Sequence, residues 1–259
     1  SAKVMKGSLR DFFKVILQMI KAKRHIKRLQ ENGYDIKNVL EIIQNDNDTN
    51  TIVYTSPEFQ PYSDTFSDRY VFVGPSIRPT NEVFEKTREK LVYISMGTVN
   101  NDMTVFYKNC IDALKDSDYQ VVLSVGSQVD IKQLENYVIK SKGKAQFHVF
   151  PYVNQIAVLK KADAFITHCG MNSVSEALYF KVPLVMYPQT NEQKGVAFRV
   201  NELEAGLYLS GDSISEIQII LKELLQQSKY KERATAISNS FSKCGGSQRA
   251  VEKILDVCF

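Results

Sequence analysis

The feature of this sequence that most limits its possible folds is a regular alternation of strand and helix patterns after residue 90. Six short apolar runs, rich in β-branched and aromatic residues, alternate with segments whose apolar residues recur at helical spacing. The runs are LVYISMG, YQVVLSVG, AQFHVFPYV, DAFITHCG, VPLVMYPQ and GLYLSG, and the helices expected between them cover 102–115, 130–141, 155–162, 173–180 and 191–204. Three more helices are expected near 213–227, 229–242 and 247–258. Strands that alternate with helices form parallel sheets covered on both faces, so we predict an α/β fold of this kind.

The first 90 residues have a different pattern. Apolar residues at helical spacing predict a long helix over 3–30, which the pair Asn32 and Gly33 would end, and a shorter helix over 36–43. The runs TIVYTS and YVFVGP are typical of short strands. Residues 76–90 are rich in charged side chains and separate the two patterns, so we interpret them as a linker. The part before the linker is expected to be mainly helical.

Composition and charge exclude several classes of protein. With 44% apolar and 24% charged residues, the 259-residue chain has the composition of an ordinary folded protein. Its net charge of +4 is too small to indicate nucleic-acid binding. The first 31 residues hold nine lysines and arginines against two acidic residues, which would also suit a helix that lies on an anionic membrane. We expect instead that this helix packs its apolar stripe and solvates its charges.

The cysteines and the hydropathy pattern indicate the cellular compartment. The four cysteines, Cys110, Cys169, Cys244 and Cys258, are widely spaced and form no C-x-x-C pair, as in proteins with reduced thiols. No apolar run has the length of a membrane span. The early run FFKVILQMI is interrupted by a lysine and a glutamine and is followed by no cleavage site, which argues against a signal peptide. We therefore expect a cytoplasmic protein with no stable membrane insertion.

Polar residues follow four of the predicted strands at the point where each strand ends. In open parallel sheets, ligands bind beyond the carboxyl ends of the strands, so these residues are candidates for a single site. They are Thr98, Asn100 and Asn101 after LVYISMG, Tyr152 and Gln155 after FHVF, Gly170, Asn172 and Ser173 after AFITH, and Thr190, Asn191, Glu192 and Gln193 after LVMYPQ. This convergence is stronger evidence for a binding site than any single motif.

The stretch HCGMNS, from His168 to Ser173, has the features of an anion site. A strand that turns into a helix leaves unpaired N–H groups at the positive end of the helix dipole. Gly170 permits close approach, and His168 and Ser173 can donate hydrogen bonds, which suits a phosphate or diphosphate. A purely structural interpretation stays open, in which Asn172 and Ser173 cap the helix and His168 belongs to the core.

Glu176 and Tyr152 each have two interpretations. One helical turn beyond Ser173, the Glu176 carboxylate is placed to accept hydrogen bonds from vicinal sugar hydroxyls, as acidic residues do in dinucleotide sites. The same S-x-x-E spacing is also that of a capping box. Tyr152 is suited to stacking on a base, and the alternative is an ordinary aromatic residue at the rim of the sheet.

Together these motifs resemble the signature of family 1 nucleotide-sugar glycosyltransferases of the GT-B fold, especially the bacterial macrolide type. Plant members carry W-x-x-Q, then H-C-G-W-N-S-x-x-E, then D/E-Q; this chain has YVNQ at 152–155, HCGMNSVSE at 168–176 and EQ at 192–193. Weaker similarity covers YTSPEFQP, FVGPSIRP and GGSQRAVEKIL. A tyrosine and a methionine replace the two tryptophans of the plant pattern, and the tyrosine leaves open whether the base is uracil or thymine.

The resemblance implies a role for each residue of these motifs in binding a UDP-sugar. It places the base against Tyr152 and the Val153 backbone, the nucleoside beside Gln155, and the ribose hydroxyls on Glu176. The diphosphate would be held by Gly97, Thr98, His168, Gly170, Asn172 and Ser173, and the transferred sugar by Glu192 and Gln193. The UDP-sugar is a substrate, and neither a cofactor nor a metal is expected.

The resemblance also implies the reaction and the domain organisation. Members of this family transfer a sugar from a UDP-sugar to a hydroxyl of a small-molecule acceptor, with inversion and without a metal, and their base is a histidine of an N-terminal domain. We therefore interpret 1–75 as a remnant of that acceptor-binding domain, 76–90 as the linker, 91–242 as a Rossmann-like donor-binding domain and 243–259 as a C-terminal helix. His25, the only histidine before the linker, receives no catalytic role, so we expect a fragment that binds the donor but lacks the base.

Several other interpretations compete with this one. A non-catalytic donor-binding subunit of a split glycosyltransferase and a sugar-nucleotide epimerase remain alternatives. A dinucleotide-dependent oxidoreductase is disfavoured because no G-x-G-x-x-G follows a strand. Asp46 and Asp48 resemble a metal-binding D-x-D pair, but a polar loop explains them better. Cys169, next to His168, is expected to be a buried thiol and not a nucleophile.

Overall fold

The computed structural model describes residues 22–38, 49–97 and 103–258, and the chain forms two compact units, Ser1–Thr51 and Ile52–Phe259. Several predicted features lie outside the described residues: the start of the first helix over 3–21, the pair Asp46 and Asp48, and the three polar residues Thr98, Asn100 and Asn101.

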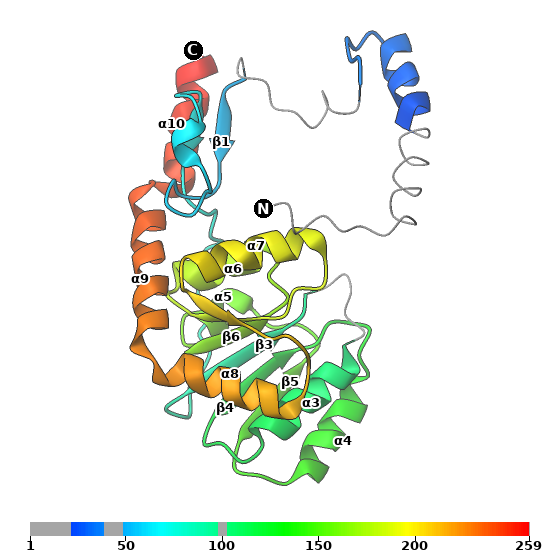
Figure 1. Cartoon of the computed structure of the whole chain (residues 1–259), viewed down its shortest axis with the longest axis vertical. Coiled ribbons are helices and arrows are strands. Elements are labelled where there is room, and N and C mark those ends of the chain that lie inside the picture. Colours follow the sequence, from blue (N-terminus) through cyan, green and yellow to red (C-terminus); the bar gives the residue numbers. More distant parts are fainter. Residues whose placement is uncertain (1–21, 39–48, 98–102, 259) are drawn as a thin grey trace. The chain divides into compact units, whose positions relative to one another are not determined.

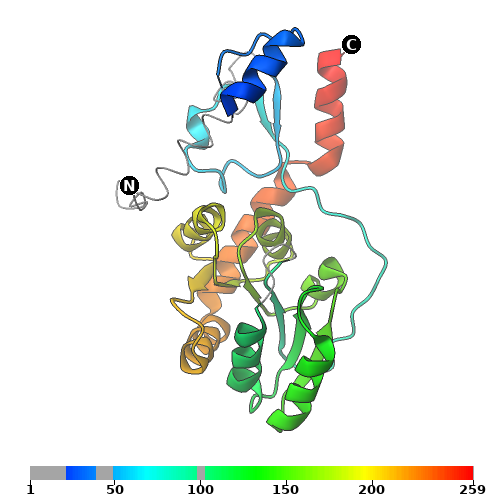
Figure 2. The same ribbon diagram turned by 90° about the vertical axis from the view of Figure 1, so that its right-hand side faces the viewer.

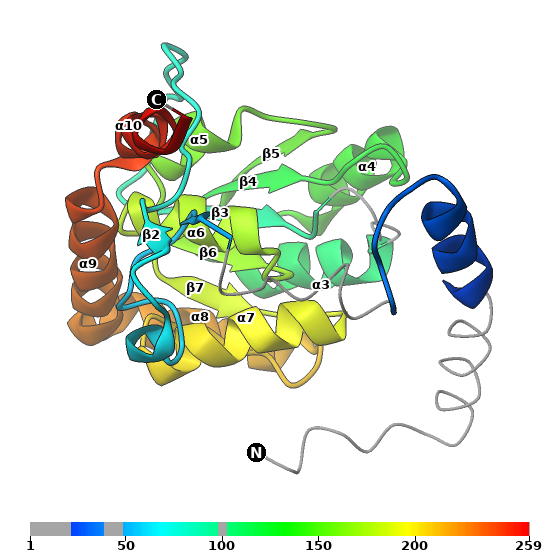
Figure 3. The ribbon, with the colours of Figure 1, turned by 90° about the horizontal axis from the view of Figure 1, so that it is seen from above.

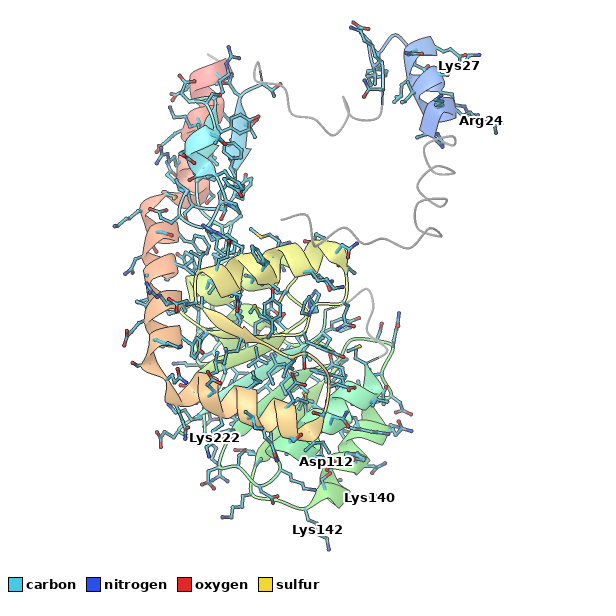
Figure 4. All side chains as sticks on the ribbon, in the orientation of Figure 1. Arg24, Lys27, Asp112, Lys140, Lys142 and Lys222 are labelled. Atoms are coloured by element: carbon cyan, nitrogen blue, oxygen red, sulfur yellow. The ribbon has the colours of Figure 1, made fainter. Side chains whose placement is uncertain are left out.

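The described part of the first unit contains a helix over residues 22–31. Arg24 and Lys27 project from this helix (Figure 4), whereas Ile26 is only 8% exposed. Gly33 takes a φ of 87° just after the helix, where the sequence predicts its end. Over its described residues, the predicted basic helix therefore buries an apolar side chain and solvates its charges. The shorter helix predicted over 36–43 is absent from its first three residues, and the rest of it lies outside the described chain.

The second unit is built around a six-stranded parallel sheet with the order β5-β4-β3-β6-β7-β8 (Figures 1 and 3). Its strands are β3 (Leu91–Ser95), β4 (Gln120–Ser124), β5 (Gln146–Phe150), β6 (Ala164–Thr167), β7 (Leu184–Met186) and β8 (Gly206–Tyr208). Val92 of β3 lies opposite Val121 of β4 on one side and Ala164 of β6 on the other. The chain order therefore reverses between β3 and β6, which places a ligand-binding crevice at the carboxyl ends of these strands. The predicted α/β fold with a parallel sheet is confirmed.

Helices cover both faces of this sheet (Figure 1). One face carries α3 (Thr104–Leu114), α4 (Ile131–Ser141) and α8 (Ile214–Gln226), and the other α5 (Gln155–Leu159), α6 (Met171–Tyr179), α7 (Asn191–Glu202) and α9 (Ser228–Lys243). Successive side chains of a strand point to opposite faces, so Val92 and Ile94 pack against the first group and Leu91 and Tyr93 against the second. All four are at most 1% exposed. Burial on both faces explains why the strands appear in the sequence as almost unbroken apolar runs.

Capping side chains fix where several of these helices begin. Asp130, Asn154 and Ser213 each accept a hydrogen bond from the backbone N–H three residues further on, at the starts of α4, α5 and α8. At the start of α7, Thr190 forms a capping box with the glutamine at the third helical position. Helix α6, like α3 and α9, has no capping side chain, and Gly170 occupies its N-cap position. Its first N–H groups are therefore left for another partner.

The residues that follow the boundary between the units pack on the end of α9. Strand β1 (Thr51–Val53) pairs with β2 (Tyr70–Phe72), and the 3₁₀ helix η1 (Ser63–Thr65) lies between them in the chain. The hydroxyls of Ser56 and Ser240 are 2.8 Å apart, and the Phe59 and Phe241 rings lie 5.8 Å apart. The predicted remnant over 1–75 therefore falls across both units, and its origin in an acceptor-binding domain stays a prediction.

Residues 76–90 lead to β3 without forming a helix or a strand (Figure 2). The Thr87 N–H donates to Gln120 Oε1 at 2.8 Å, and Lys86 Nζ lies 2.6 Å from Asp163 Oδ2. These contacts hold the segment against the ends of β4 and β6. Beyond α9 the chain continues as α10 (Gly246–Cys258). Within the described ranges, no helix is long and apolar enough to cross a membrane.

Candidate functional site

A cavity of about 920 Å³ lies at the carboxyl ends of β3 and β6, where the chain order of the sheet reverses. The predicted site residues that line it are Gly97, Tyr152, Val153, Gln155, His168, Gly170, Asn172, Ser173, Glu176, Glu192 and Gln193. Thr98, the remaining predicted residue, lies outside the described chain. The structure thus brings to one cavity every described residue to which the resemblance assigns a role. This is the consequence of strands that all end at the same edge of an open sheet. Of the other polar residues predicted at the strand ends, Thr190 also lines the cavity and Asn191 does not.

The amino end of α6 forms one wall of the cavity. Strand β6 ends at Thr167, and the chain turns through Gly170, whose φ of −62° and ψ of 136° are typical of an N-cap residue. Asn172 and Ser173 line the cavity from the second and third helical positions, so neither residue occupies the N-cap. The alternative in which they cap the helix is therefore wrong. Uncapped N–H groups at the positive end of a nine-residue helix are suited to an anion.

The imidazole of His168 is packed between two glycines. A Cβ atom added to Gly97 would lie 2.7 Å from His168 Cε1, and one added to Gly170 would lie 2.7 Å from His168 Nε2. Gly97 also has a φ of 83°, a conformation that L side chains rarely adopt. Glycine at both positions therefore allows the ring to sit between two backbone turns. The pairing of two glycines with one histidine is a property of the fold that the sequence motif does not reveal.

The surroundings of His168 favour its neutral form. Burial lowers the pKa of His168 below its ordinary value of 6.5, and the Ser95 backbone and the charge of Glu192 oppose this effect only in part. Among the described residues, no group lies in hydrogen-bond geometry to its buried Nδ1 atom. The Ser95 backbone nevertheless acts on the ring in favour of its protonated form, so the interpretation of His168 as a core residue stays open. A diphosphate beside this ring would favour the protonated form and accept its hydrogen bonds.

Gln155, at the first position of α5, connects three residues of the cavity wall. Its Nε2 atom donates to Glu176 Oε2 at 2.5 Å and to Ser173 Oγ at 3.3 Å, and its Oε1 accepts from the Tyr93 hydroxyl at 3.2 Å. Ser173 lies inside α6 and not at its N-cap, so Glu176 is not the partner of a capping box there. The Glu176 carboxylate is instead held at the cavity by Gln155, where its other oxygen can accept from a diol.

Glu192 and Gln193, at the start of α7, differ in how free their side chains are. Gln193 Oε1 accepts from the backbone N–H of Gln189 at 2.8 Å and from that of Thr190 at 3.1 Å. These two bonds use the acceptor capacity of the oxygen and leave the Nε2 protons as the donors that Gln193 can offer to a ligand. Glu192 is exposed, and its charge acts on His168 across the cavity.

The cavity also contains residues that the sequence motifs do not indicate. Arg78 and Thr80, from the segment interpreted as a linker, lie along its wall, and Tyr93 and Ser124 lie at the ends of buried strands. The side chain of Asn154 donates to Thr80 Oγ1 at 2.9 Å and so joins this segment to α5. Arg78 brings a positive charge to a wall that otherwise offers neutral donors. In the sequence, only the charge of Arg78 could have indicated a role in binding an anion. An arginine in a charge-rich segment is usually solvated, so that charge alone does not identify it.

Cys169, by contrast, takes no part in the cavity. It is 0% exposed, its Sγ lies 3.7 Å from the Thr167 carbonyl oxygen, and burial raises the pKa of its thiol. A thiol with a raised pKa is a poor nucleophile, as expected from the sequence. The residue has a φ of 67°, which is uncommon for a residue with a side chain and turns the chain sharply between β6 and α6.

Comparison with known families gives one match that covers most of the sheet domain. Residues 91–250 match the family model described as "Glycosyltransferase family 28 C-terminal domain". Among curated proteins, the chain is 38% identical over 233 residues to the uncharacterized UDP-glucosyltransferase YojK of Bacillus subtilis, covering 86% of this chain and 55% of that protein. It is also 38% identical over 209 residues to the NDP-glycosyltransferase YjiC of Bacillus subtilis, covering 78% of this chain and 52% of that protein. The chain spans about half the length of these relatives.

Solved structures of related proteins have the same fold. The calicheamicin glycosyltransferase CalG4 superposes with a TM-score of 0.76 at 26% identity, covering 91% of this chain and 58% of that chain. The glycotransferase of kitacinnamycin superposes with a TM-score of 0.71 at 27% identity, covering 79% of this chain and 54% of that chain. Both similarities extend beyond the residues of the cavity, so they reflect the whole sheet domain and not a local motif.

Proposed function

This chain belongs to the glycosyltransferases that share the family 28 C-terminal domain, and from that premise we propose that its cavity binds the nucleotide-sugar donor of a hexosyl transfer. One observation carries the proposal: three features line the same cavity. They are the uncapped start of α6, the imidazole of His168 between two glycines, and the Glu176 carboxylate held by Gln155. A nucleoside diphosphate sugar has an anion and a vicinal diol that fit these three features. The donor would be a UDP-sugar, and the acceptor a hydroxyl of a small molecule.

Each part of the donor has a proposed partner in the cavity. The base would stack on Tyr152, which is 58% exposed at the rim, and meet the Val153 backbone. The ribose would lie at Glu176 and Gln155, and the sugar near Glu192 and the Nε2 protons of Gln193. The diphosphate would lie on the α6 amino end, against the group formed by Gly97, His168, Gly170, Asn172 and Ser173.

The proposed transfer is inverting and independent of metal. The acceptor oxygen would attack the anomeric carbon as the bond to the diphosphate oxygen breaks, and the bonding electrons would leave with that oxygen. The α6 dipole, its first N–H groups, His168 and Arg78 would stabilise the departing charge. The hydroxyl proton would go to a base on the acceptor side, which we assign to no residue of this chain. We therefore expect donor binding by the chain and little or no sugar transfer.

Calorimetric titration of the purified chain with UDP, dTDP and NAD, in the presence of EDTA, tests this proposal. We expect UDP to bind, and Glu176→Ala to weaken it about tenfold or more, since a hydrogen bond to a charged group contributes about 1.5–3 kcal/mol. The matched control is Glu135→Ala, which removes an exposed carboxylate from α4 and should leave binding unchanged.

Other outcomes of this titration, and of two activity assays, would contradict parts of the proposal. NAD binding without UDP binding would contradict the assignment of a nucleoside diphosphate sugar as the ligand. UDP binding only after a divalent cation is added would contradict metal independence. Conversion of a UDP-sugar to its epimer in the absence of an acceptor would favour the epimerase alternative. Restored transfer on mixing with a separate acceptor-binding chain would favour the split-enzyme alternative.

A further inference from the structure

Tyr93 is a core residue whose hydroxyl reaches the cavity. It lies in β3, is 1% exposed, and its ring stacks on Phe165 of β6 at 4.7 Å between centroids and 17° between planes. The hydroxyl end nevertheless forms part of the cavity wall, beside Ser95 and Ser124. The ring is therefore held rigidly by two neighbouring strands while its polar end faces the ligand site. Such a side chain is well placed to orient a residue that contacts ligand directly.

The residue that Tyr93 contacts is Gln155. The Tyr93 hydroxyl donates to Gln155 Oε1 at 3.2 Å, while Gln155 Nε2 donates to Glu176 Oε2 at 2.5 Å and to Ser173 Oγ at 3.3 Å. Burial raises the pKa of Tyr93 to about 12, so its hydroxyl keeps its proton at any ordinary pH. The Gln155 side chain is thus held at its oxygen by the phenol and at its nitrogen by the carboxylate.

The direction of these hydrogen bonds determines what the cavity offers to a ligand. An ionised carboxylate only accepts, so the Gln155 amide must turn its nitrogen to Glu176 and its oxygen to Tyr93. The Ser173 hydroxyl accepts from the same nitrogen, which leaves its single proton to donate to an anion. The second oxygen of Glu176 stays available to accept from ribose hydroxyls. One amide orientation therefore makes Glu176 an acceptor and Ser173 a donor.

We propose that Tyr93 is a positioning residue of the donor site, which acts through Gln155 to set the preference for ribose over 2′-deoxyribose in the bound nucleoside diphosphate. The proposal rests on the proposed function of the cavity. Without the phenol hydroxyl, Gln155 keeps its bonds to Glu176 and Ser173 but loses the contact that fixes its oxygen. The carboxylate then has more freedom to move from the position in which it accepts from two hydroxyls. UDP offers both ribose hydroxyls to the carboxylate and 2′-deoxy-UDP offers only one. The affinity for UDP should therefore fall more than the affinity for 2′-deoxy-UDP.

The test is calorimetric titration of wild type and Tyr93→Phe with UDP and with 2′-deoxyuridine 5′-diphosphate. We expect the wild type to prefer UDP, and Tyr93→Phe to reduce this preference about two- to tenfold, the range for loss of one net hydrogen bond. Gln155→Ala should reduce the preference at least as much, and adding Tyr93→Phe to Gln155→Ala should reduce it no further. Thermal unfolding of each variant reports separately on the fold.

The matched control is Tyr230→Phe. Tyr230 is also buried, at 4% exposure, but its hydroxyl bonds to Glu223 Oε1 at 3.0 Å, away from the cavity residues. We expect this variant to keep the preference of wild type, even if it lowers the unfolding temperature.

Each outcome has a distinct meaning. If Tyr93→Phe weakens both nucleotides by the same factor, its role is structural and the inference is wrong. If Tyr93→Phe and Gln155→Ala reduce the preference additively, Tyr93 does not act through Gln155. If wild type binds neither nucleotide, the proposed function itself fails, and if it binds both without preference, Glu176 does not bind the ribose.

Discussion

The packing of His168 between two glycines makes Gly170→Ala a direct test of the proposed diphosphate site. The backbone of Gly170 has φ −62° and ψ 136°, which any residue can adopt, so an alanine adds no backbone strain there. Its Cβ would lie 2.7 Å from His168 Nε2, a distance at which one of the two groups must move. The new Cβ is fixed to the backbone, whereas the imidazole can rotate about its side-chain bonds. We therefore expect the ring to be displaced from the cavity and the backbone to stay.

The size of the effect follows from what the ring would contribute. A hydrogen bond to a charged group is worth about 1.5–3 kcal/mol, so displacing the donor from a diphosphate should weaken UDP binding about tenfold to 150-fold. The fold should lose less, because alanine at an N-cap position typically costs about 1 kcal/mol relative to Ser, Thr, Asn or Asp, and the native glycine already costs a few tenths of a kcal/mol. Calorimetry with UDP and thermal unfolding of Gly170→Ala measure the two effects separately.

Two further variants show whether the ring is the cause. Gly97→Ala also places a Cβ 2.7 Å from the ring, at Cε1, but at a φ of 83° that adds about 1–2 kcal/mol of backbone strain. It should lose similar affinity and more thermal stability than Gly170→Ala. In a His168→Ala background there is no ring to displace, so Gly170→Ala should cause no further loss. A full additional loss in that background, or wild-type affinity in Gly170→Ala alone, would refute the reasoning.

Three other predictions concern stability. The pKa of His168 is lowered from 6.5 in the folded chain, so protonation favours the unfolded state and the stability of wild type should fall as the pH drops below about 6.5. The fall should be less steep in His168→Gln, and thermal unfolding of both proteins between pH 8 and 5 measures the difference. Gly195→Ala should raise the free energy of unfolding by about 0.5–1 kcal/mol in urea, since a Cβ in this helical position meets no atom within 4 Å, and a loss of stability would contradict this. Thr55→Val should raise it by about 1 kcal/mol, because Thr55 Oγ1 is buried and, within the described ranges, has no partner; an unchanged urea midpoint would argue for a partner of that hydroxyl.

The sheet and its helices could be predicted because each strand is buried on both faces and each helix on one. Two-sided burial produces runs such as VVLS and AFIT, and one-sided burial produces helical spacing, so the sequence carries both signals locally. The gathering of the motifs at one cavity followed from the shared edge of parallel strands. The family resemblance inferred from the motifs at 152–193 is confirmed by the family match over 91–250.

Residues whose roles depend on approach between distant elements could not be predicted. Tyr93 has the sequence context of a core residue, and only the docking of α5 on the sheet brings Gln155 to its hydroxyl. Arg78 lies in a segment without helix or strand, so no periodicity indicates where its side chain points. The resemblance assigns Gln193 to the transferred sugar without saying which of its atoms bind, and the structure shows that its oxygen is used by the turn before α7. In each case the sequence shows the residue type and only the tertiary structure determines which atoms are free.

Three departures from ordinary folding rules lie next to one another at the amino end of α6, where the proposed ligand site lies. Helices α4, α5, α7 and α8 begin with capping side chains, whereas α3, α6 and α9 do not, and of these three only α6 begins at the cavity. Cys169, immediately before Gly170, adopts a positive φ, and the neighbouring His168 has a buried Nδ1 without a partner among the described residues. Each of these features costs stability, on the order of 1 kcal/mol or more. A single anion at the α6 amino end would pair the N–H groups and draw a proton to the imidazole, so binding would offset these three neighbouring costs together.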